Sequence, residues 1–212
     1  MKLLAVNVAF PRTVSIDGRT YSTGIYKTAL EGPAWLGKLN LAGDGQGDLK
    51  NHGGSYQAVY CYPHEHYAFW SERLGRDDFA FGQFGENFTT EGLLENEVCV
   101  GDTLRIGAAL IQVTQPRVPC YKLANKLGIR GFDKTFLRAN RSGFYAQALE
   151  EGEVAAGDTI ERVSRDPVGM TVAQVNAALL LDKQPAAIER ALLLEALSPE
   201  WRGRFEQMLA KA

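Results

Sequence analysis

The fold class is decided by one stretch of sequence, Val98-Cys99-Val100-Gly101-Asp102-Thr103-Leu104-Arg105-Ile106-Gly107-Ala108-Ala109-Leu110-Ile111-Gln112-Val113. In it, apolar runs of strand length alternate with the turn residues Gly101-Asp102 and Gly107, a pattern typical of β-hairpins. A second Gly-Asp-Thr, at residues 157–159, again precedes an apolar residue. We therefore expect two similar turns in one β-rich body.

Short helices are expected to interrupt this β-rich part. Pro63 suits a first helical position, and apolar residues follow it at helical spacing until Gly75. Residues 123–127 and 133–138 are typical of two shorter helices, whereas residues 1–8 predict a first strand. Many short strands with a few inserted helices favour an α+β fold that is mainly β over alternating βαβ units.

The chain changes character near Pro167 and predicts three helices from there on. Thr171 with Gln174 forms a capping-box signature, which marks a helix start. Pro185 and Ser198-Pro199 predict the starts of two more helices. The apolar faces of three such short helices exceed what they can hide from water among themselves. We expect them to pack on the β-rich part or against a second copy of the chain.

The chain has 212 residues, of which 45% are hydrophobic and 23% are charged. At about 150 residues per domain, this length predicts one full domain and a small addition, which we place at residues 1–165 and 166–212. The net charge of -2 argues against a general nucleic-acid-binding protein. No apolar run approaches the ~18 residues that a membrane span needs, so we expect no membrane association.

The chain has three cysteines and three histidines, which limits the disulfides and metal sites that it can form. An odd, small number of cysteines argues against a disulfide framework and favours a reducing cytoplasm. His64 and His66 would share one face of a strand, but the surrounding pattern favours a helix, which separates their side chains. The sequence contains neither Cys-x-x-Cys nor His-Glu-x-x-His. A zinc site is therefore disfavoured.

The densest glycine-rich segment is Gly43-Asp44-Gly45-Gln46-Gly47-Asp48-Leu49-Lys50-Asn51-His52-Gly53-Gly54. It matches neither the phosphate-binding P-loop nor the dinucleotide-binding pattern. Its glycines would still let backbone N–H groups approach an anion, and Lys50, Asn51 and His52 would add donors. A long solvated loop is the alternative interpretation.

Cys120 is the strongest candidate for a reactive thiol. It follows two prolines in Gln115-Pro116-Arg117-Val118-Pro119-Cys120-Tyr121-Lys122, and two cations, Arg117 and Lys122, are near in sequence. Nearby cations favour the thiolate, which is the form that attacks electrophiles or binds metals. Cys61 and Cys99 lie in strand-like patterns and are expected to be core thiols. From spacing alone, a packed and unreactive Cys120 is the alternative.

Two shorter segments carry polar groups suited to an anion. Lys27 and Thr28 stand side by side after Gly24, an arrangement suited to a phosphate or a carboxylate. Asn87 lies in Gly85-Glu86-Asn87-Phe88-Thr89, which is a turn with polar donors or merely a turn. Each segment alone is weak evidence, because surface lysines and polar turns are common.

Taken together, these segments resemble one family, the MOSC-domain proteins of the YiiM type. MOSC is named for the C-terminal domain of molybdenum-cofactor sulfurases. The resemblance covers about residues 1–165, and the three expected C-terminal helices resemble that subfamily's three-helix extension. The motifs that carry it occur in the family's order: Thr23-Gly24-Ile25-x-Lys27, Gly43-Asp44-Gly45-Gln46-x-Asp48, His52-Gly53-Gly54, Phe84-Gly85-Glu86-Asn87, Val100-Gly101-Asp102 and Gln115-Pro116-Arg117-x-Pro119-Cys120.

The resemblance implies a β-barrel-like domain with inserted helices that binds a molybdopterin-type cofactor or handles sulfur through a cysteine. In the cofactor-binding members that cysteine is a molybdenum ligand, and Cys120 stands at the matching position. Lys27 with Thr28 resembles the pair that holds the pterin phosphate in those relatives. The resemblance and the donors named above place the other cofactor-binding residues at Lys50, His52, Gly53, Gly54, Asn87 and Arg117.

The YiiM-type proteins reduce N-hydroxylated compounds such as 6-hydroxylaminopurine, so the resemblance implies a molybdenum-dependent oxidoreductase. We expect Cys120 to be catalytic, and His52 to be either a proton donor or a supporting residue. The sequence shows no clear flavin, haem or iron–sulfur module, so a separate protein would supply the electrons. A homodimer is a further expectation. Two other functions stay open: sulfur transfer through a persulfide on Cys120, and a non-enzymatic carrier of the cofactor.

Overall fold

The computed structural model describes residues 1–16, 18–48 and 53–211. Its strands are β1 (Lys2–Val8), β2 (Arg12–Ile16), β3 (Arg19–Thr23), β4 (Thr28–Ala29), β5 (Ala34–Leu36), β6 (Val59–Pro63), β7 (Phe88–Glu91), β8 (Thr103–Ile106), β9 (Ala109–Pro116), β10 (Phe144–Glu150), β11 (Gly152–Val154) and β12 (Ile160–Ser164). Its helices are the 3₁₀ helix η1 (Ser55–Gln57) and the α-helices α1 (Glu65–Leu74), α2 (Tyr121–Leu127), α3 (Phe132–Arg138), α4 (Val172–Leu180), α5 (Pro185–Leu192) and α6 (Pro199–Leu209).

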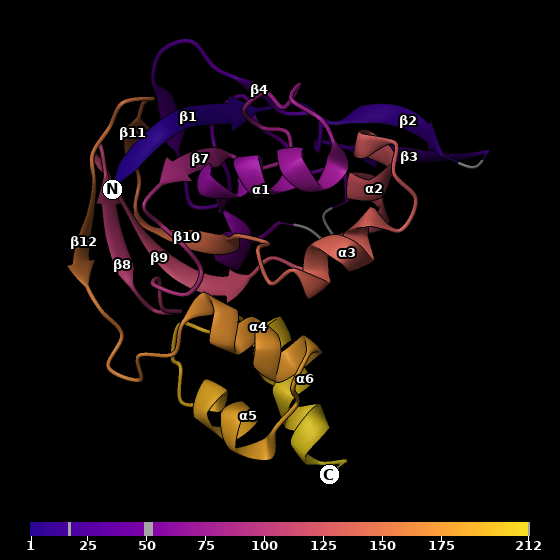
Figure 1. Ribbon diagram of the computed structural model, residues 1–212. Helices are drawn as coiled ribbons and strands as arrows, with labels where there is room; N and C mark the ends of the chain where they lie inside the picture. Colours follow the sequence, from indigo (N-terminus) through magenta and orange to yellow (C-terminus); the bar gives the residue numbers. More distant parts are fainter. Residues whose placement is uncertain (17, 49–52, 212) are drawn as a thin grey trace.

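Most strands belong to one eight-stranded sheet, in the order β12-β8-β9-β10-β6-β7-β1-β4 (Figure 1). Neighbours in this sheet are antiparallel except β6 and β7, which are parallel. Two separate pairs, β5 with β11 and β2 with β3, complete the described strands. The prediction of a mainly β fold with inserted helices is confirmed.

The large sheet curls without closing. In the described part of the chain its strand order has two ends, β12 and β4, so the barrel-like domain implied by the resemblance is an open sheet rather than a closed barrel. The start of β1 nevertheless reaches the segment before β12. Lys2 forms an isolated bridge with Thr159, and the Gly157 N–H donates to the Leu3 carbonyl at 2.7 Å. These contacts wrap the sheet around its apolar core.

The stretch that decides the fold class forms the predicted hairpin, β8–β9, in which Ile106 pairs with Ala109 across the turn. Residues 98–100 differ from the expectation, because they form only an isolated bridge, from Cys99 to Thr171, in place of a strand. The two Gly-Asp-Thr segments make similar turns, as predicted. Asp102 and Asp158 each accept a hydrogen bond from the backbone N–H three residues earlier, at 3.1 and 2.8 Å.

Helix α1 begins later than the proline pattern predicts. Pro63 is the last residue of β6 and pairs with Thr90 of β7, and the His64 N–H donates to the Thr90 carbonyl at 2.7 Å. Strand pairing with β7 therefore replaces the expected first helical position. The helix ends, as expected, at Gly75, whose φ of 61° lies in the left-handed region.

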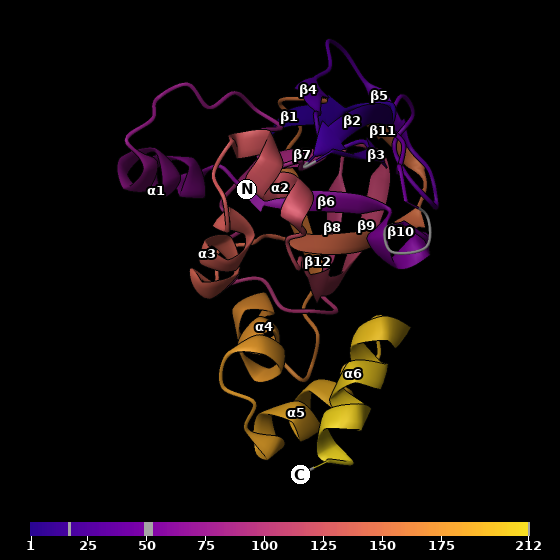
Figure 2. The same ribbon diagram turned by 90° about the vertical axis from the view of Figure 1, so that its right-hand side faces the viewer.

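The three C-terminal helices gather at one end of the molecule, below the sheet in Figures 1 and 2. Helix α4 begins with the predicted capping box, in which Thr171 and Gln174 each donate a backbone N–H to the other's side-chain oxygen. Val175, Trp201 and Phe205 belong to the same apolar cluster as the sheet, so the helices pack on the β-rich part. Leu193 is an exception to this packing, because 66% of it is exposed.

A second, mainly aromatic cluster packs α1, α2 and α3 against β6. Trp70 of α1 stacks on Phe136 of α3 with ring centroids 5.2 Å apart, and Phe136 stacks on Tyr62 of β6 at 5.7 Å. The Trp70 indole N–H also donates to the Tyr62 hydroxyl at 2.7 Å, so this buried N–H group has a hydrogen-bond partner. This cluster fixes α2 beside the sheet, and Cys120 immediately precedes α2.

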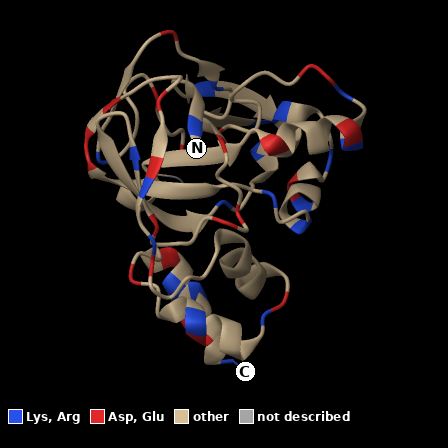
Figure 3. Cartoon of the chain, turned by 60° about the vertical axis from the view of Figure 1, so that its left-hand side comes forward, with Lys and Arg blue, Asp and Glu red and all other residues tan. Residues whose placement is uncertain are grey.

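Lys and Arg residues are interspersed with Asp and Glu over both parts of the chain (Figure 3). The mixture accords with the net charge of -2. Among the described helices, none has the length and apolar character needed to cross a bilayer.

Candidate functional site

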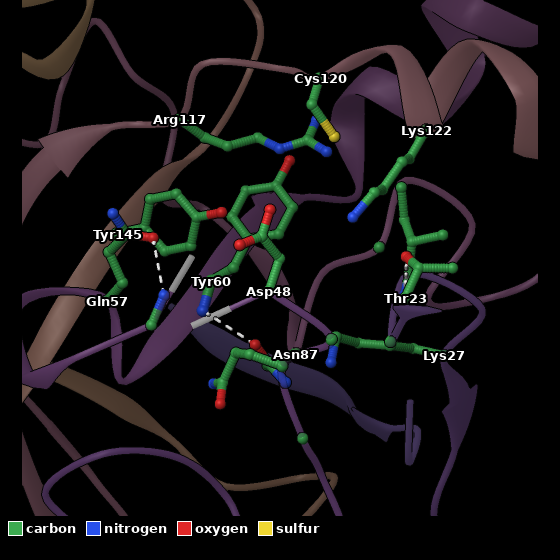
Figure 4. Close-up of a pocket in the computed structure, with 17 residues that line it drawn as sticks. Thr23, Lys27, Asp48, Gln57, Tyr60, Asn87, Arg117, Cys120, Lys122 and Tyr145 are labelled. Carbon is green, nitrogen blue, oxygen red and sulfur yellow. Dashed lines mark hydrogen bonds between the residues drawn. The ribbon is translucent and has the colours of Figure 1, made fainter. Parts of the chain in front are cut away.

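A cleft with ≈ 640 Å³ of empty space opens among loops that are far apart in sequence (Figure 4). Its lining comes from the segment after β3, the glycine-rich segment, the turn before β7 and the segment between β9 and α2, with single residues of β6 and β10. Of the predicted site residues, the cleft brings together Lys27, Gly53, Asn87, Arg117 and Cys120.

Cys120 is placed by the way in which β9 ends. Pro116, the last residue of β9, pairs with Phe144 of β10, and the Arg117 N–H then donates to the Gly143 carbonyl at 3.1 Å. The chain turns away from the sheet there, and Cys120 becomes the N-cap of α2 with an extended backbone. Its side chain is half-buried, and Figure 4 shows the sulfur beside the Arg117 guanidinium, facing the cleft.

Arg117 is a buried cation in the wall of the cleft, with only 5% of its surface exposed. Its guanidinium carbon lies 4.8 Å from the ring centroid of Tyr60 and 5.5 Å from that of Phe136. Among the described residues, its Nη1 atom has no hydrogen-bond partner. Burial alone would lower the pKa of Arg117, but Tyr60, Tyr145 and Cys120 outweigh burial and raise it, so the side chain stays charged.

Lys27 lies across the cleft and forms an ion pair with Asp44, in which both side chains are buried. Burial lowers the pKa of Lys27, and the Asp44 carboxylate partly offsets that effect. Asp44 also accepts hydrogen bonds from the Ala9 N–H at 2.9 Å and from Asn87 Nδ2 at 2.8 Å. The ammonium group of Lys27 is therefore held in a fixed position.

The side-chain amide of Asn87 lines the cleft but is committed to the protein. Its Oδ1 accepts from the Tyr60 N–H at 3.1 Å, and its Nδ2 donates to the Asn7 carbonyl at 3.3 Å as well as to Asp44. Asn87 thus joins β1 and β6 to the Lys27–Asp44 pair. In this geometry Asn87 positions Lys27 through Asp44.

The glycines of residues 43–47 have a packing reason that the sequence did not reveal. A Cβ atom on Gly47 would lie 2.4 Å from the backbone carbon of Ser22, and one on Gly24 would lie 2.3 Å from the Gly45 carbonyl oxygen. The two segments therefore touch backbone to backbone, with no room for side chains between them. This contact places residues 45–48 in the wall of the cleft.

Several predicted residues lie elsewhere or outside the described part. Thr28 is exposed and lines a neighbouring groove instead, together with Lys27, His64 and Lys126. Burial lowers the pKa of Lys126 to about 8. Gly54 is exposed, and a Cβ atom there would meet no atom within 4 Å. Two further predicted residues, Lys50 and His52, lie outside the described residues.

The structure adds lining residues that were not among the predicted cofactor-binding residues. Lys122 is buried, donates from Nζ to the Ser22 carbonyl at 3.2 Å and points into the cleft in Figure 4. Tyr145 and Tyr60 pair with each other across β10 and β6 and supply the floor. Lys122 is two residues after Cys120, so its nearness was a usable signal. The tyrosines could be found only from the register of strands distant in sequence.

The remaining histidines and cysteines form no rival centre in the described structure. His66 lies in α1, as the helical pattern predicts, and its Nε2 is 2.6 Å from Oε2 of Glu95. No group of three or more potential metal ligands occurs among the described residues. Cys61 and Cys99 are buried, as predicted, and burial raises the pKa of both thiols.

Chemically, the cleft combines cations with a thiol. The cleft is lined by three cations, Lys27, Arg117 and Lys122, and by one acidic residue, Asp48, so its lining has a positive excess although the whole chain carries a net charge of -2. Buried cations of this kind suit a ligand with a phosphate or another compact anion. Cys120 lines the same space, beside these cations.

Comparison with known proteins links this geometry to a family. The model of the MOSC domain matches residues 48–161, and the model of the YiiM-like three-α-helix domain matches residues 170–212. The uncharacterized protein YflK of Bacillus subtilis is 43% identical over 204 residues, which is 96% of this chain and 92% of YflK.

Two further similarities concern a solved structure and a named enzyme. The crystal structure of YiiM from Geobacillus stearothermophilus superimposes with a TM-score of 0.83 at 34% identity, and 98% of each chain is covered. A protein named "Reductase" from Gibberella moniliformis is 32% identical over 151 residues, which is 70% of this chain but 27% of that protein.

Proposed function

Because this chain belongs to the MOSC-domain family and carries the YiiM-like three-helix domain, we propose that it is a molybdenum-cofactor-dependent reductase. We propose N-hydroxylated compounds, such as 6-hydroxylaminopurine, as its substrates. The observation that carries the proposal is the buried guanidinium of Arg117, whose Nη1 lacks a partner among the described residues, beside the Cys120 thiol. The reductase name of one relative supports the reaction class.

The residues of the cleft fit a molybdopterin-type cofactor. The cofactor's phosphate carries about two negative charges, and Lys27, Arg117 and Lys122 provide a lining of matching sign. A polarizable thiolate is a suitable ligand for a soft metal site, and Cys120 is the lining residue that can supply one. When bound, the cofactor supplies a metal centre that changes its oxidation state by two electrons.

The protein's own contribution is to hold these groups in place. Packing against the rings of Tyr60 and Phe136 orients Arg117 beside the thiol, and the neighbouring Tyr60, Tyr145 and Cys120 keep it charged although burial opposes the charge. Asp44 and Asn87 hold the Lys27 ammonium on the opposite wall. Such preorganised charges stabilise an anion without reorganisation at the moment of binding. Cys120 as metal ligand, and His52 as proton donor, are parts of the proposal.

The proposal includes partners and surroundings. A reductase of this kind needs an electron source, and we propose a separate donor protein. Homodimer formation and residence in the cytoplasm are likewise proposed, on the resemblance stated above.

Substitution of Cys120 tests the function directly. We expect Cys120→Ser to lower the molybdenum content of the purified protein at least tenfold, and to abolish hydroxylamine reduction with an artificial electron donor, because a serine hydroxyl ionises far less readily than a thiol and so does not replace the thiolate ligand. Metal analysis by mass spectrometry and a reduction assay measure the two effects. Cys99→Ala, at a buried cysteine away from the cleft, is the matched control.

The same experiment separates the other two functions. Sulfane sulfur on Cys120 in a protein without molybdenum would indicate sulfur transfer. Stoichiometric molybdenum without reductase activity would indicate a carrier of the cofactor. If Cys120→Ser changes neither metal content nor activity, the assignment of the site to Cys120 is wrong.

A further inference from the structure

A second cleft lies next to the first, and Cys120 lines both. The two share Asp48, Gln57, Cys120, Lys122 and Tyr145 in their linings. The second cleft differs in its remaining wall, because α6 of the C-terminal helices contributes to it. Cys120 therefore lines both a space walled by the β-rich part and a space walled jointly with the three-helix extension.

The wall of the second cleft contains a buried acceptor. Gln115 is only 3% exposed, and within the described part of the chain its Oε1 atom has no hydrogen-bond partner. A buried carbonyl oxygen without a partner costs free energy, on the order of 1–3 kcal/mol. Its presence beside a cleft is explained if a ligand donates a hydrogen bond to it.

Helix α6 adds a second acceptor. Glu200, in the first turn of α6, lines the cleft and accepts from Arg204 Nη2 at 2.8 Å, which leaves its other carboxylate oxygen outside this bond. Both side chains are about half exposed. The Glu200 charge also acts on the phenol of Tyr145, contributing to the rise of its pKa, which is caused mainly by burial. Glu200 and Cys120 therefore line the same space.

Aromatic rings complete the cleft. Tyr21 and Tyr121 line it as an edge-to-face pair with centroids 5.3 Å apart, and Tyr121 is exposed. Tyr145 and Trp201 contribute further aromatic surface. Aromatic side chains bind flat rings by stacking or edge contacts, while neighbouring acceptors form hydrogen bonds with N–H groups on the edge of the ring.

We infer that Glu200 of α6 is a specificity-determining residue, which together with Gln115 accepts hydrogen bonds from the ring-edge N–H groups of the substrate proposed above when its flat ring binds in the second cleft. This inference rests on the proposed function, since it assigns the substrate of that same site. It gives the three-helix extension a direct part in the chemistry. The first cleft then holds the anionic cofactor. The second cleft holds the substrate ring beside Cys120.

Glu200→Ala tests the inference. Adenine serves as the probe, because it carries the expected ring and N–H donors and has no N–O bond to reduce. We expect adenine binding to the full-length protein, measured by titration calorimetry, to weaken five- to tenfold in the variant. In the molybdenum-loaded protein, KM for 6-hydroxylaminopurine should rise by a similar factor while kcat changes less than twofold.

Glu206→Ala is the matched control, because Glu206 is an exposed glutamate of the same helix that does not line the cleft. An exposed ion pair such as Glu200–Arg204 contributes only about 0–1 kcal/mol, so Glu200→Ala should fold normally. Gln115→Met, which removes the buried acceptor, should weaken adenine binding as well.

Unchanged adenine binding in both Glu200→Ala and Gln115→Met would overturn the inference. The adenine titration requires no molybdenum, so it stays informative if the reductase proposal fails. Adenine binding that depends on Glu200, in a protein without reductase activity, would support the cleft assignment and count against the proposed function alone.

Discussion

The side chain of Arg117 shows how a single residue can reveal what a site binds. Burying a guanidinium group is costly unless every donor finds an acceptor. Two aromatic faces and the neighbouring tyrosines compensate part of that cost, yet Nη1 is left without a partner among the described residues. A fold that needed Arg117 only for stability would satisfy this donor internally. The arrangement instead favours an anionic ligand.

Arg117→Met therefore separates binding from stability. Hydrogen bonds to charged groups contribute about 1.5–3 kcal/mol, so the loss of this cation should weaken retention of the anionic cofactor roughly ten- to hundredfold. Because methionine fills part of the same apolar space, the melting temperature should stay the same or rise. Molybdenum content and calorimetric unfolding measure the two effects.

Arg105→Met is the control for this prediction, since Arg105 forms an exposed ion pair with Glu150. It should change neither molybdenum content nor stability appreciably. A large fall in the melting temperature of Arg117→Met, with normal molybdenum content, would show that Arg117 is a structural residue.

At the scale of elements, the glycine-rich segment depends on close backbone packing. At Gly24, Gly45 and Gly47, a neighbouring heavy atom lies less than 3.0 Å from the position that a Cβ atom would occupy. The end of β3 and residues 43–47 can therefore meet only where side chains are missing. This contact forms one wall of the cleft, so its loss should affect both stability and binding.

Gly47→Ala should destabilise the protein by about 1–3 kcal/mol, as is usual for overpacking, because its methyl group would meet the Ser22 backbone. The same substitution at Gly203, inside α6, meets no atom within 4 Å outside the helix backbone. Gly203→Ala should stabilise the protein by up to about 1 kcal/mol, since alanine favours helix. Urea unfolding of both variants measures the change in the free energy of unfolding, which should fall for Gly47→Ala and rise for Gly203→Ala. Equal effects would contradict the packing explanation.

At the scale of the whole molecule, the β-rich part and the C-terminal helices share one core. The residues of α4–α6 and of the sheet belong to a single apolar cluster. Buried Asp102 holds the junction: it accepts from the Asp166 N–H at 3.1 Å, and it forms an ion pair with Arg162 at 3.2 Å. The two parts should therefore unfold together.

Deletion of residues 167–212 should expose the face of the sheet that the helices cover. Large exposed apolar patches promote association, so we expect the truncated protein to aggregate. Size-exclusion chromatography with light scattering measures this directly, with the full-length protein as reference. A soluble, monodisperse truncation that keeps its molybdenum would contradict both the shared core and the need for α6 at the site.

Much of the local structure could be predicted from residues close together in the chain. Examples are the β8–β9 hairpin, the capping box at Thr171 and the helix end at Gly75. Each depends on short-range hydrogen bonds and backbone preferences, which can be predicted from a few consecutive residues. The prediction that Pro63 begins a helix was wrong, because Pro63 pairs with β7, a strand distant in sequence. Cys120, Arg117 and Lys27 were predicted because they lie in motifs that a known family shares.

Neighbouring residues were enough to predict the mainly β composition and the three C-terminal helices, whereas Cys120, Arg117 and Lys27 were chosen as site residues through the family resemblance. Three features could be seen only in the folded chain: the sheet curls without closing, Tyr60 and Tyr145 line the same cleft as Cys120, and α6 brings Glu200 to a neighbouring cleft that Cys120 also lines. These features depend on pairings between residues many positions apart. Such pairings are chosen by burial of the whole apolar core rather than by local preference.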